Sequence, residues 1–217
     1  MQQRFAPALL EQVETLPELS RPILLECGPK ELPKLLSERA PGVRFDRLIG
    51  RNVLTRETNK EEIASCLPPL LVDSGILVLA ESLPRYAQRL YRLVGATEIG
   101  KKLHARWSEA EEAIYNDPDD PMVNYDGEDL REILERAGFE ARVEIEQTRV
   151  NLYIDRVTVA RWFSTTEGGR PSLVVRLGER LTGEEVGAVR EAVTRQLADR
   201  TVPWSGAIAF CHCRKQL

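Results

Sequence analysis

Apolar residues in the first 82 positions follow two kinds of pattern. Short uninterrupted apolar runs predict buried β-strands, and apolar residues that recur every three or four positions predict helices with one apolar face. The predicted strands cover 22–27, 43–50 and 75–82, and the predicted helices cover 4–16, 30–40 and 59–74. Helices that alternate with strands predict a parallel, doubly wound α/β sheet. The strand at 75–82 lacks polar alternation, so we expect both of its faces to be covered.

From residue 84 onward, longer helical patterns are followed by strands that alternate polar and apolar residues. The predicted order is helices over 84–94 and 96–116, an acidic loop over 116–129, a helix over 129–139, a strand over 140–154, a helix over 157–164, a loop over 165–172, a helix through Leu197 and a strand over 202–215. Thr182 and Glu185 form a capping-box pattern at the start of the helix that ends at Leu197. Gly138 suits the position just after the C-cap of the helix over 129–139.

Composition narrows the class of protein. The 217 residues carry a formal charge of −4 with a pI of about 5.5, which argues against direct, broad nucleic-acid binding but leaves room for a local basic patch. The longest apolar run, at 75–80, is far shorter than the roughly 20 residues of a membrane span. The N-terminal residues lack the apolar core of a signal peptide. Four cysteines without disulfide-framework spacing fit free thiols, so we expect a cytoplasmic protein.

Polar residues at the ends of two predicted strands are the first candidate site. Gly50, Arg51 and Asn52 follow the strand over 43–50, and Glu81 lies at the end of the next one. In α/β sheets, ligands bind at the carboxyl ends of strands. Asn52 could hydrogen-bond a substrate and Arg51 could hold an anion. The alternatives are a plain strand-exit turn and, for Glu81, a cap for the helix predicted near Pro84.

Two charged clusters are candidate interaction surfaces. Asp117, Asp119 and Asp120 belong to the acidic loop, which is either a solvated loop or a surface for a partner protein. A second set, spaced as one face of a predicted helix, consists of Arg85, Arg89 and Arg92. That face either touches nucleic acid or is simply solvated.

A metal site is not expected. Cys211 and Cys213 share one face of a predicted strand while His212 points to the other face, and this is a poor arrangement for binding one zinc ion.

Several segments together resemble class I S-adenosylmethionine-dependent methyltransferases. FDRLIGRNVL and CLPPLLVDSGILVLAES resemble that family's fourth and fifth strands, and PWSGAIAFCHCRK resembles its last, antiparallel strand. A narrower resemblance, carried by ETLPELSRP, ESLPRYAQRLY and EEAIYNDPDDPMVNYD, is to the methyltransferase-like C-terminal region of a cyanobacterial fusion with an AAA+ ATPase of replication-associated recombination. The ATPase's phosphate-binding motif is absent from this sequence.

The resemblance implies a Rossmann-like sheet of order 3-2-1-4-5-7-6, with S-adenosylmethionine held by a glycine-rich loop after strand one. That loop has no counterpart here, and residues 22–27 match strand three. We therefore expect one α/β domain over 1–217 that is N-terminally truncated, lacks the first two strands and carries a helical and acidic-loop insertion at about 84–139. An unpaired strand edge is costly, so we also expect strand 22–27 either to pair beside 43–50 or to lie at an exposed edge that could form a dimer.

Three functions remain open. The first is an incomplete methyltransferase-like domain that is not catalytic as this chain, because its binding of S-adenosylmethionine is doubtful without the loop. The second is an interaction or assembly module for an AAA+ ATPase in DNA replication or recombination. The third is a methyltransferase that obtains its cofactor-binding half from a partner chain.

Overall fold

The computed structural model describes residues 25, 27–164 and 171–216. The chain divides into two compact units, Met1–Val43 and Arg44–Leu217. In the first unit, helix α2 (Leu32–Arg39) lies within the predicted range 30–40. The predicted helix over 4–16, most of the predicted strand 22–27 and most of the predicted loop 165–172 lie outside the described residues. The pairing of strand 22–27 and the single domain over 1–217 therefore stay predictions.

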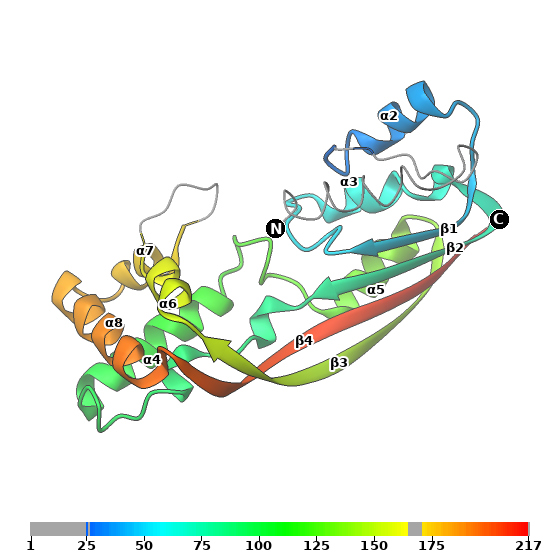
Figure 1. The fold of residues 1–217 in the computed structure, drawn as a ribbon. Helices are drawn as coiled ribbons and strands as arrows, with labels where there is room; N and C mark the ends of the chain where they lie inside the picture. The colour runs from blue at the N-terminus through cyan, green and yellow to red at the C-terminus, as the bar shows by residue number, and fades with distance from the viewer. Residues whose placement is uncertain (1–24, 26, 165–170, 217) are drawn as a thin grey trace. The chain divides into compact units, whose positions relative to one another are not determined.

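The second unit is built on a four-stranded mixed sheet of order β1-β2-β4-β3 (Figure 1). Its strands are β1 (Phe45–Arg51), β2 (Leu71–Ser82), β3 (Phe139–Ile154) and β4 (Arg200–Lys215). β1 and β2 are parallel, whereas β4 is antiparallel to both of its neighbours. This order and these strand directions match the 4-5-7-6 part of the sheet that the resemblance implies, with the last strand antiparallel. The predicted fold class is confirmed.

One face of the sheet is covered by two helices, α3 (Lys60–Ser65) and α5 (Gly127–Arg136). Leu77 and Leu79 of β2 are buried on this face, while Val78 between them is only half-buried. The expectation that 75–82 is covered on both faces is therefore wrong. Gly75, Leu77, Leu79 and Glu81 are buried, and the residues that alternate with them are partly exposed. An unbroken apolar run does not reveal this difference between the faces.

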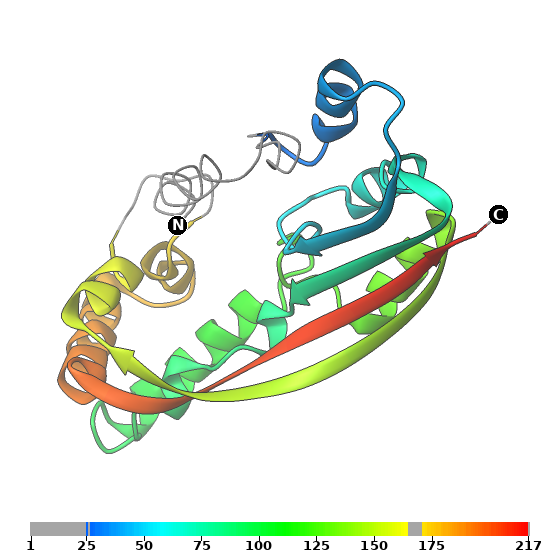
Figure 2. The same cartoon turned by 45° about the vertical axis from the view of Figure 1, so that its right-hand side comes forward.

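A second core lies where β3 and β4 continue past the end of β2. The pairing of β2 with β4 stops at Ser82 and Ile208, and β3 and β4 extend onward as a two-stranded ribbon (Figure 2). The helices around this ribbon are α4 (Lys101–Tyr115), α6 (Arg156–Trp162), α7 (Leu173–Gly178) and α8 (Gly183–Leu197). Trp107 is fully buried in this cluster. Trp162 stacks on Trp204 with ring centroids 5.7 Å apart.

Three predicted helices are wrong in extent. The helix over 96–116 begins only at Lys101, after Gly100 with its φ of 82°. The helix over 59–74 ends at Ser65, a 3-10 turn (Pro68–Leu70) follows, and β2 begins at Leu71. Two consecutive prolines remove backbone donors, so the helix cannot continue through them. The predicted helix over 84–94 consists instead of two 3-10 turns, Pro84–Tyr86 and Leu90–Arg92, with extended backbone at Ala87 and Arg89.

Local capping signals locate other helix ends. Thr182 and Glu185 form the predicted capping box of α8. Asp126 and Asp129 form a second capping box, and it starts α5 two residues earlier than the sequence pattern predicts. Gly138 has a φ of 94° and follows the C-cap residue of α5, as expected.

Candidate functional site

The carboxyl ends of β1 and β2 lie side by side, and Asn52 connects them. Its backbone N–H donates to the Ala80 carbonyl at 3.0 Å, and its side-chain Oδ1 accepts the Ser82 N–H at 2.9 Å. The φ of Asn52 is 53°, in the left-handed region that asparagine tolerates better than most residues. Asn52 therefore continues the β1–β2 pairing through a turn that ordinary strand geometry could not follow.

Glu81 is fully buried at the end of β2, and its carboxylate organises the loop that leaves β1. Oε1 accepts the Val53 N–H at 2.7 Å. Oε2 accepts the N–H groups of Leu54 and Thr55 at 3.2 and 2.9 Å and the Thr55 hydroxyl at 2.6 Å. Both carboxylate oxygens are thus occupied by the chain itself. Glu81 does not cap a helix near Pro84, because only a 3-10 turn forms there.

Two further residues complete this buried cluster, and the sequence analysis did not single them out. The Tyr125 hydroxyl donates to the Ser82 carbonyl at 2.7 Å and lies 3.1 Å from Thr55 Oγ1. Burial raises the pKa of Tyr125 to about 12. Lys60 Nζ lies 4.4 Å from the centre of the Tyr125 ring and donates to the carbonyls of Glu57 and Pro121 at 2.8 and 2.6 Å. Burial lowers the pKa of Lys60, and the negative charge of Glu81 opposes that effect.

The other two predicted residues differ in accessibility. Gly50 is half-buried, and a Cβ there would lie 2.5 Å from Val53 Cγ2 and 2.8 Å from Leu79 Cδ2, so an added side chain would force one of these neighbours to shift. Arg51 is exposed, and its guanidinium has no hydrogen-bond or ion-pair partner among the described residues. Of the four predicted pocket residues, Arg51 alone presents a free charged group.

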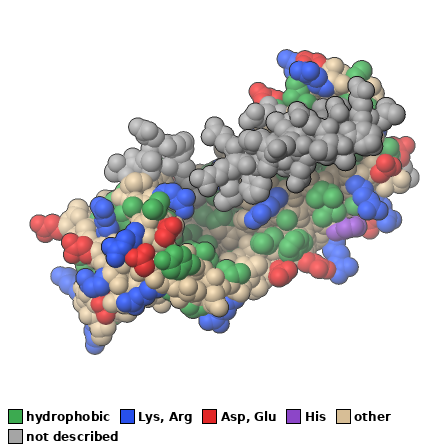
Figure 3. Space-filling view, viewed as in Figure 1, with side chains coloured by type: hydrophobic (Ala, Val, Ile, Leu, Met, Phe, Trp, Pro, Cys, Tyr) green, Lys and Arg blue, Asp and Glu red, His purple; other side chains and the backbone are tan. Residues whose placement is uncertain are grey.

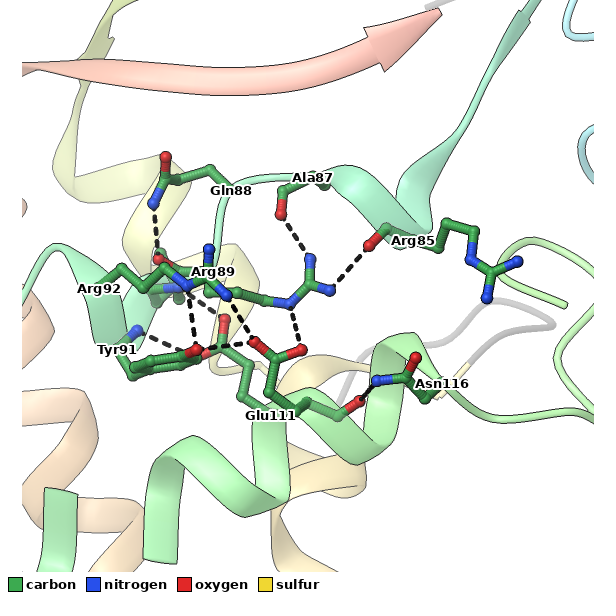
Figure 4. A network of polar contacts seen from close by, with 10 residues as sticks. Arg85, Ala87, Gln88, Arg89, Tyr91, Arg92, Glu111 and Asn116 are labelled. Atoms are coloured by element: carbon green, nitrogen blue, oxygen red, sulfur yellow. Dashed lines mark hydrogen bonds and ion pairs between the residues drawn. The ribbon is translucent and has the colours of Figure 1, made fainter. Parts of the chain in front are cut away.

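The three predicted basic residues do not form one helical face, because the segment is not a helix (Figure 4). Arg89 is only 7% exposed and donates to the carbonyls of Ala87 and Arg85 at 2.5 and 2.8 Å. Its Nε lies 3.2 Å from Glu112 Oε2. Arg92 pairs with the same Glu112 at 3.1 Å, whereas Arg85 pairs with Asp126 at 3.6 Å. Arg89 is therefore a buried residue that stabilises the turn through backbone carbonyls, and its guanidinium is not exposed to solvent.

Glu111 of α4 is the second fully buried carboxylate of the described chain. It accepts the N–H groups of Leu90 and Tyr91 at 2.6 and 3.1 Å. Burial raises the pKa of Glu111 to about 7, against the lowering effect of the two N–H donors. Glu81 and Glu111 thus have the same structural role, in which a buried carboxylate satisfies the amides of a neighbouring non-helical turn.

The acidic loop is partly neutralised by one arginine of α7. Arg176 contacts Asp117 at 2.5 Å and Asp120 at 3.5 Å, and Asp120 is only 7% exposed. The pKa of Asp117 is lowered, first by the Asp119 N–H and further by Arg176. Asp119 itself is exposed, and its N–H donates to Asp117 Oδ1 at 2.9 Å. Of the three predicted aspartates of the acidic loop, only Asp119 has an exposed side chain without a cation beside it.

Cys211 and Cys213 are buried on the covered face of β4, and His212 is exposed on the other face, as the alternation predicts. Burial raises the pKa of both thiols to about 12.

Across residues 27–164 and 171–216, no three His, Cys, Asp or Glu side chains are grouped so that they could hold a metal ion. In the same residues, no helix has both the length and the apolar character needed to cross a membrane.

No protein-family model and no curated protein matches the sequence. Structurally similar chains include a SAM-dependent methyltransferase from Archaeoglobus fulgidus, with 16% identity and a TM-score of 0.39 over 91% of this chain and 69% of that one. The cyclase SpnF has 17% identity and a TM-score of 0.43 over 98% and 61%. Phosphoethanolamine N-methyltransferase 2 from Haemonchus contortus, in complex with S-adenosyl-L-methionine, has 13% identity and a TM-score of 0.32 over 80% and 34%. This chain therefore spans between 34% and 69% of the length of these three chains.

Proposed function

We propose that this chain is a methyltransferase-like domain that does not transfer methyl groups by itself. The observation that carries the proposal is the environment of Glu81. It is the carboxylate at the strand edge where the family's ligands bind, yet its oxygens accept three backbone N–H groups and one hydroxyl from the chain itself. A carboxylate with four intramolecular donors has little capacity left for the hydroxyls of a ligand.

The described residues do not fit S-adenosylmethionine in the way that the resemblance implies. The family's glycine-rich turn from strand to helix would supply backbone N–H groups to the methionine end of the cofactor. That turn follows the family's strand one, whereas β1 corresponds to its strand four, and the turn after β1 directs the N–H groups of Val53, Leu54 and Thr55 into Glu81. Arg51 remains available to an anionic group, but a single exposed arginine does not make a cofactor site.

A thermal-shift titration with S-adenosylmethionine and S-adenosylhomocysteine tests the proposal. A ligand that binds the native state at about 100 times its Kd adds roughly 2.7 kcal/mol of stability, which raises Tm by several degrees for a domain of this size. We expect no saturable shift up to millimolar ligand in a sample that unfolds cooperatively. A saturable shift with either compound would overturn the proposal and direct the search to a methyl acceptor.

A second candidate is an interaction or assembly module for an AAA+ ATPase of DNA replication or recombination. The observation that favours it is an apolar stripe on the sheet face opposite α3 and α5, where Ile49 is 82% exposed and Phe210 is 40% exposed. Cross-strand partners line up on this face: Ile49 lies beside Val78, and Val78 beside His212. Figure 3 shows apolar side chains gathered along the sheet, with charged groups around them. A surface of this kind is typical of protein interaction sites.

The test of this second candidate is co-sedimentation with a purified ATPase of the replication-associated recombination type. Ile49→Asp places a charge in the stripe and should abolish an interaction that uses this face. Val157→Asp, which adds the same charge at a 73% exposed apolar residue of α6, is the matched control and should leave the interaction intact. Co-sedimentation that survives Ile49→Asp, or none with the unmodified chain, would exclude this surface.

A further inference from the structure

A shallow basic groove lies beside the first residue of β4, beyond the point where β2 stops pairing with that strand. It is formed by the exposed side of α8, the first residue of α6 and the first residue of β4, and its volume is about 790 Å³. Its lining residues are Arg156, Gly187, Arg190, Glu191, Thr194, Arg195, Ala198 and Arg200. Four arginines and one glutamate in one groove contrast with the net negative charge of the whole chain.

The floor of the groove follows from the sequence of α8. Gly187, Thr194 and Ala198 are separated by seven and four residues, which places them on one side of the helix. Glycine has no side chain and the other two side chains are short, so the longer arginines beside them form walls. The Thr194 hydroxyl donates to the Arg190 carbonyl at 2.7 Å and is thereby held against the helix.

The four arginines are not equally engaged. Arg156 pairs with Asp199 at 2.7 Å, and Arg195 pairs with Glu98 at 3.7 Å. Arg190 and Arg200 are exposed, and neither guanidinium has a hydrogen-bond or ion-pair partner among the described residues. Two free guanidinium groups therefore border a floor of small residues, in a geometry that suits phosphate oxygens because a guanidinium can donate two parallel hydrogen bonds to them.

We propose that this groove binds the phosphodiester backbone of nucleic acid without reading its sequence. A small phosphate compound would stay largely exposed in so open a groove, whereas small-molecule sites bury most of their ligand. A polymer gains from several weak phosphate contacts along the groove. The lining contains no aromatic residue on which a base could stack, so the contacts would be to the backbone alone.

The test is fluorescence anisotropy with a labelled 20-nucleotide DNA strand and the corresponding duplex, measured at several salt concentrations. If four arginines contact phosphates, the slope of log K against log salt is about −2.8 for the single strand. Arg190→Gln combined with Arg200→Gln should reduce the magnitude of that slope by about 1.4. If the variant and the unmodified chain bind DNA equally near 1 M salt, the variant should bind about 25-fold more weakly at 0.1 M salt. Two oligonucleotides of unrelated sequence should bind equally.

The matched control is Arg47→Gln combined with Arg214→Gln. These two arginines are also exposed and without described partners, and they lie on the open sheet face instead of the groove. The control removes the same charge and should keep at least half of the affinity. The proposal would be overturned if both double variants lost the same affinity, or if neither oligonucleotide bound. It would also be overturned if inorganic phosphate or poly-glutamate displaced the DNA at an equivalent concentration of charge.

Discussion

The carboxylate of Glu81 lies 2.7 Å from the backbone nitrogen of Val53 and joins the end of β2 to the loop that leaves β1. In sequence the two residues are 28 positions apart. This contact, repeated at the next two amides, turns the edge where an α/β fold normally binds ligands into an internally satisfied structure. The same solution appears around the second core, where Glu111 binds the amides of Leu90 and Tyr91.

Replacement of Glu81 should therefore strongly destabilise the protein. Glu81→Ala leaves three N–H groups and the Thr55 hydroxyl without their acceptor, at a cost of about 1–3 kcal/mol for each buried group that stays unpaired. We expect a loss of at least about 3 kcal/mol in urea unfolding, with partial rescue by Glu81→Gln, which keeps one oxygen acceptor. Glu140→Gln on the exposed side of β3 is the control and should change stability by less than about 0.5 kcal/mol. Equal stabilities of Glu81→Ala and the control would refute this role.

Glu111 should make stability depend on pH between about 4.5 and 7. Its pKa in the folded state is about 7, above the ordinary value of 4.5, because burial disfavours the charged form. The folded state therefore holds the proton over this interval while the unfolded state has lost it, so stability falls as pH rises and levels off above about 7. The size of this contribution is on the order of 3 kcal/mol.

The measurement for Glu111 is the urea midpoint of the unmodified chain and of Glu111→Gln from pH 5 to pH 8. The variant cannot ionise, so its advantage over the unmodified chain should grow with rising pH. Parallel profiles for the two proteins would show that Glu111 does not titrate in this range.

Arg89 and Arg92 offer a direct comparison of a buried with an exposed arginine on the same carboxylate. Arg89→Ala leaves two carbonyls without a donor and removes the buried cation from Glu112, so we expect a loss of about 3–5 kcal/mol. Arg92→Ala removes a side chain that is 62% exposed and should cost less than about 1 kcal/mol. Chemical unfolding of the two variants decides the matter. Similar losses would mean that Arg89 is as dispensable as a surface residue.

Two glycine substitutions should change stability in opposite directions. Gly50→Ala forces a methyl group against Val53 and Leu79, and overpacking of this kind costs about 1–3 kcal/mol. Gly187→Ala lies within α8 with no atom inside 4 Å of the added Cβ, so it should stabilise by about 0.5–1 kcal/mol through a lower entropy of the unfolded chain. Thermal unfolding of both variants tests the pair. A stabilising Gly50→Ala would show that the contact between β1 and its exit turn is not tight.

The sequence predicted several features correctly because local chemistry encodes them. The alternation of polar and apolar residues in 140–154 predicted β3. The capping box of Thr182 and Glu185 predicted the start of α8, and Gly138 predicted the end of α5. Capping and strand alternation depend on neighbours a few residues away, which a sequence displays directly. The order of the four strands followed from the resemblance of segments that are far apart in the chain.

Tertiary contacts decided the rest. The pattern over 84–94 is helical, but the carboxylate of Glu111, from another element, holds two of its amides in a different conformation. In the sequence, Glu81 is a polar residue at the end of a predicted strand. In the folded protein, the loop after β1 covers Glu81 and buries it completely. A short sequence window cannot show such contacts, because their free energy comes from a buried charge and distant N–H groups that meet only after the chain has folded. The sequence by itself thus determined the four strands of the second unit, the start of α8 and the end of α5, and the tertiary structure decided which polar residues at the sheet edge remain free to bind.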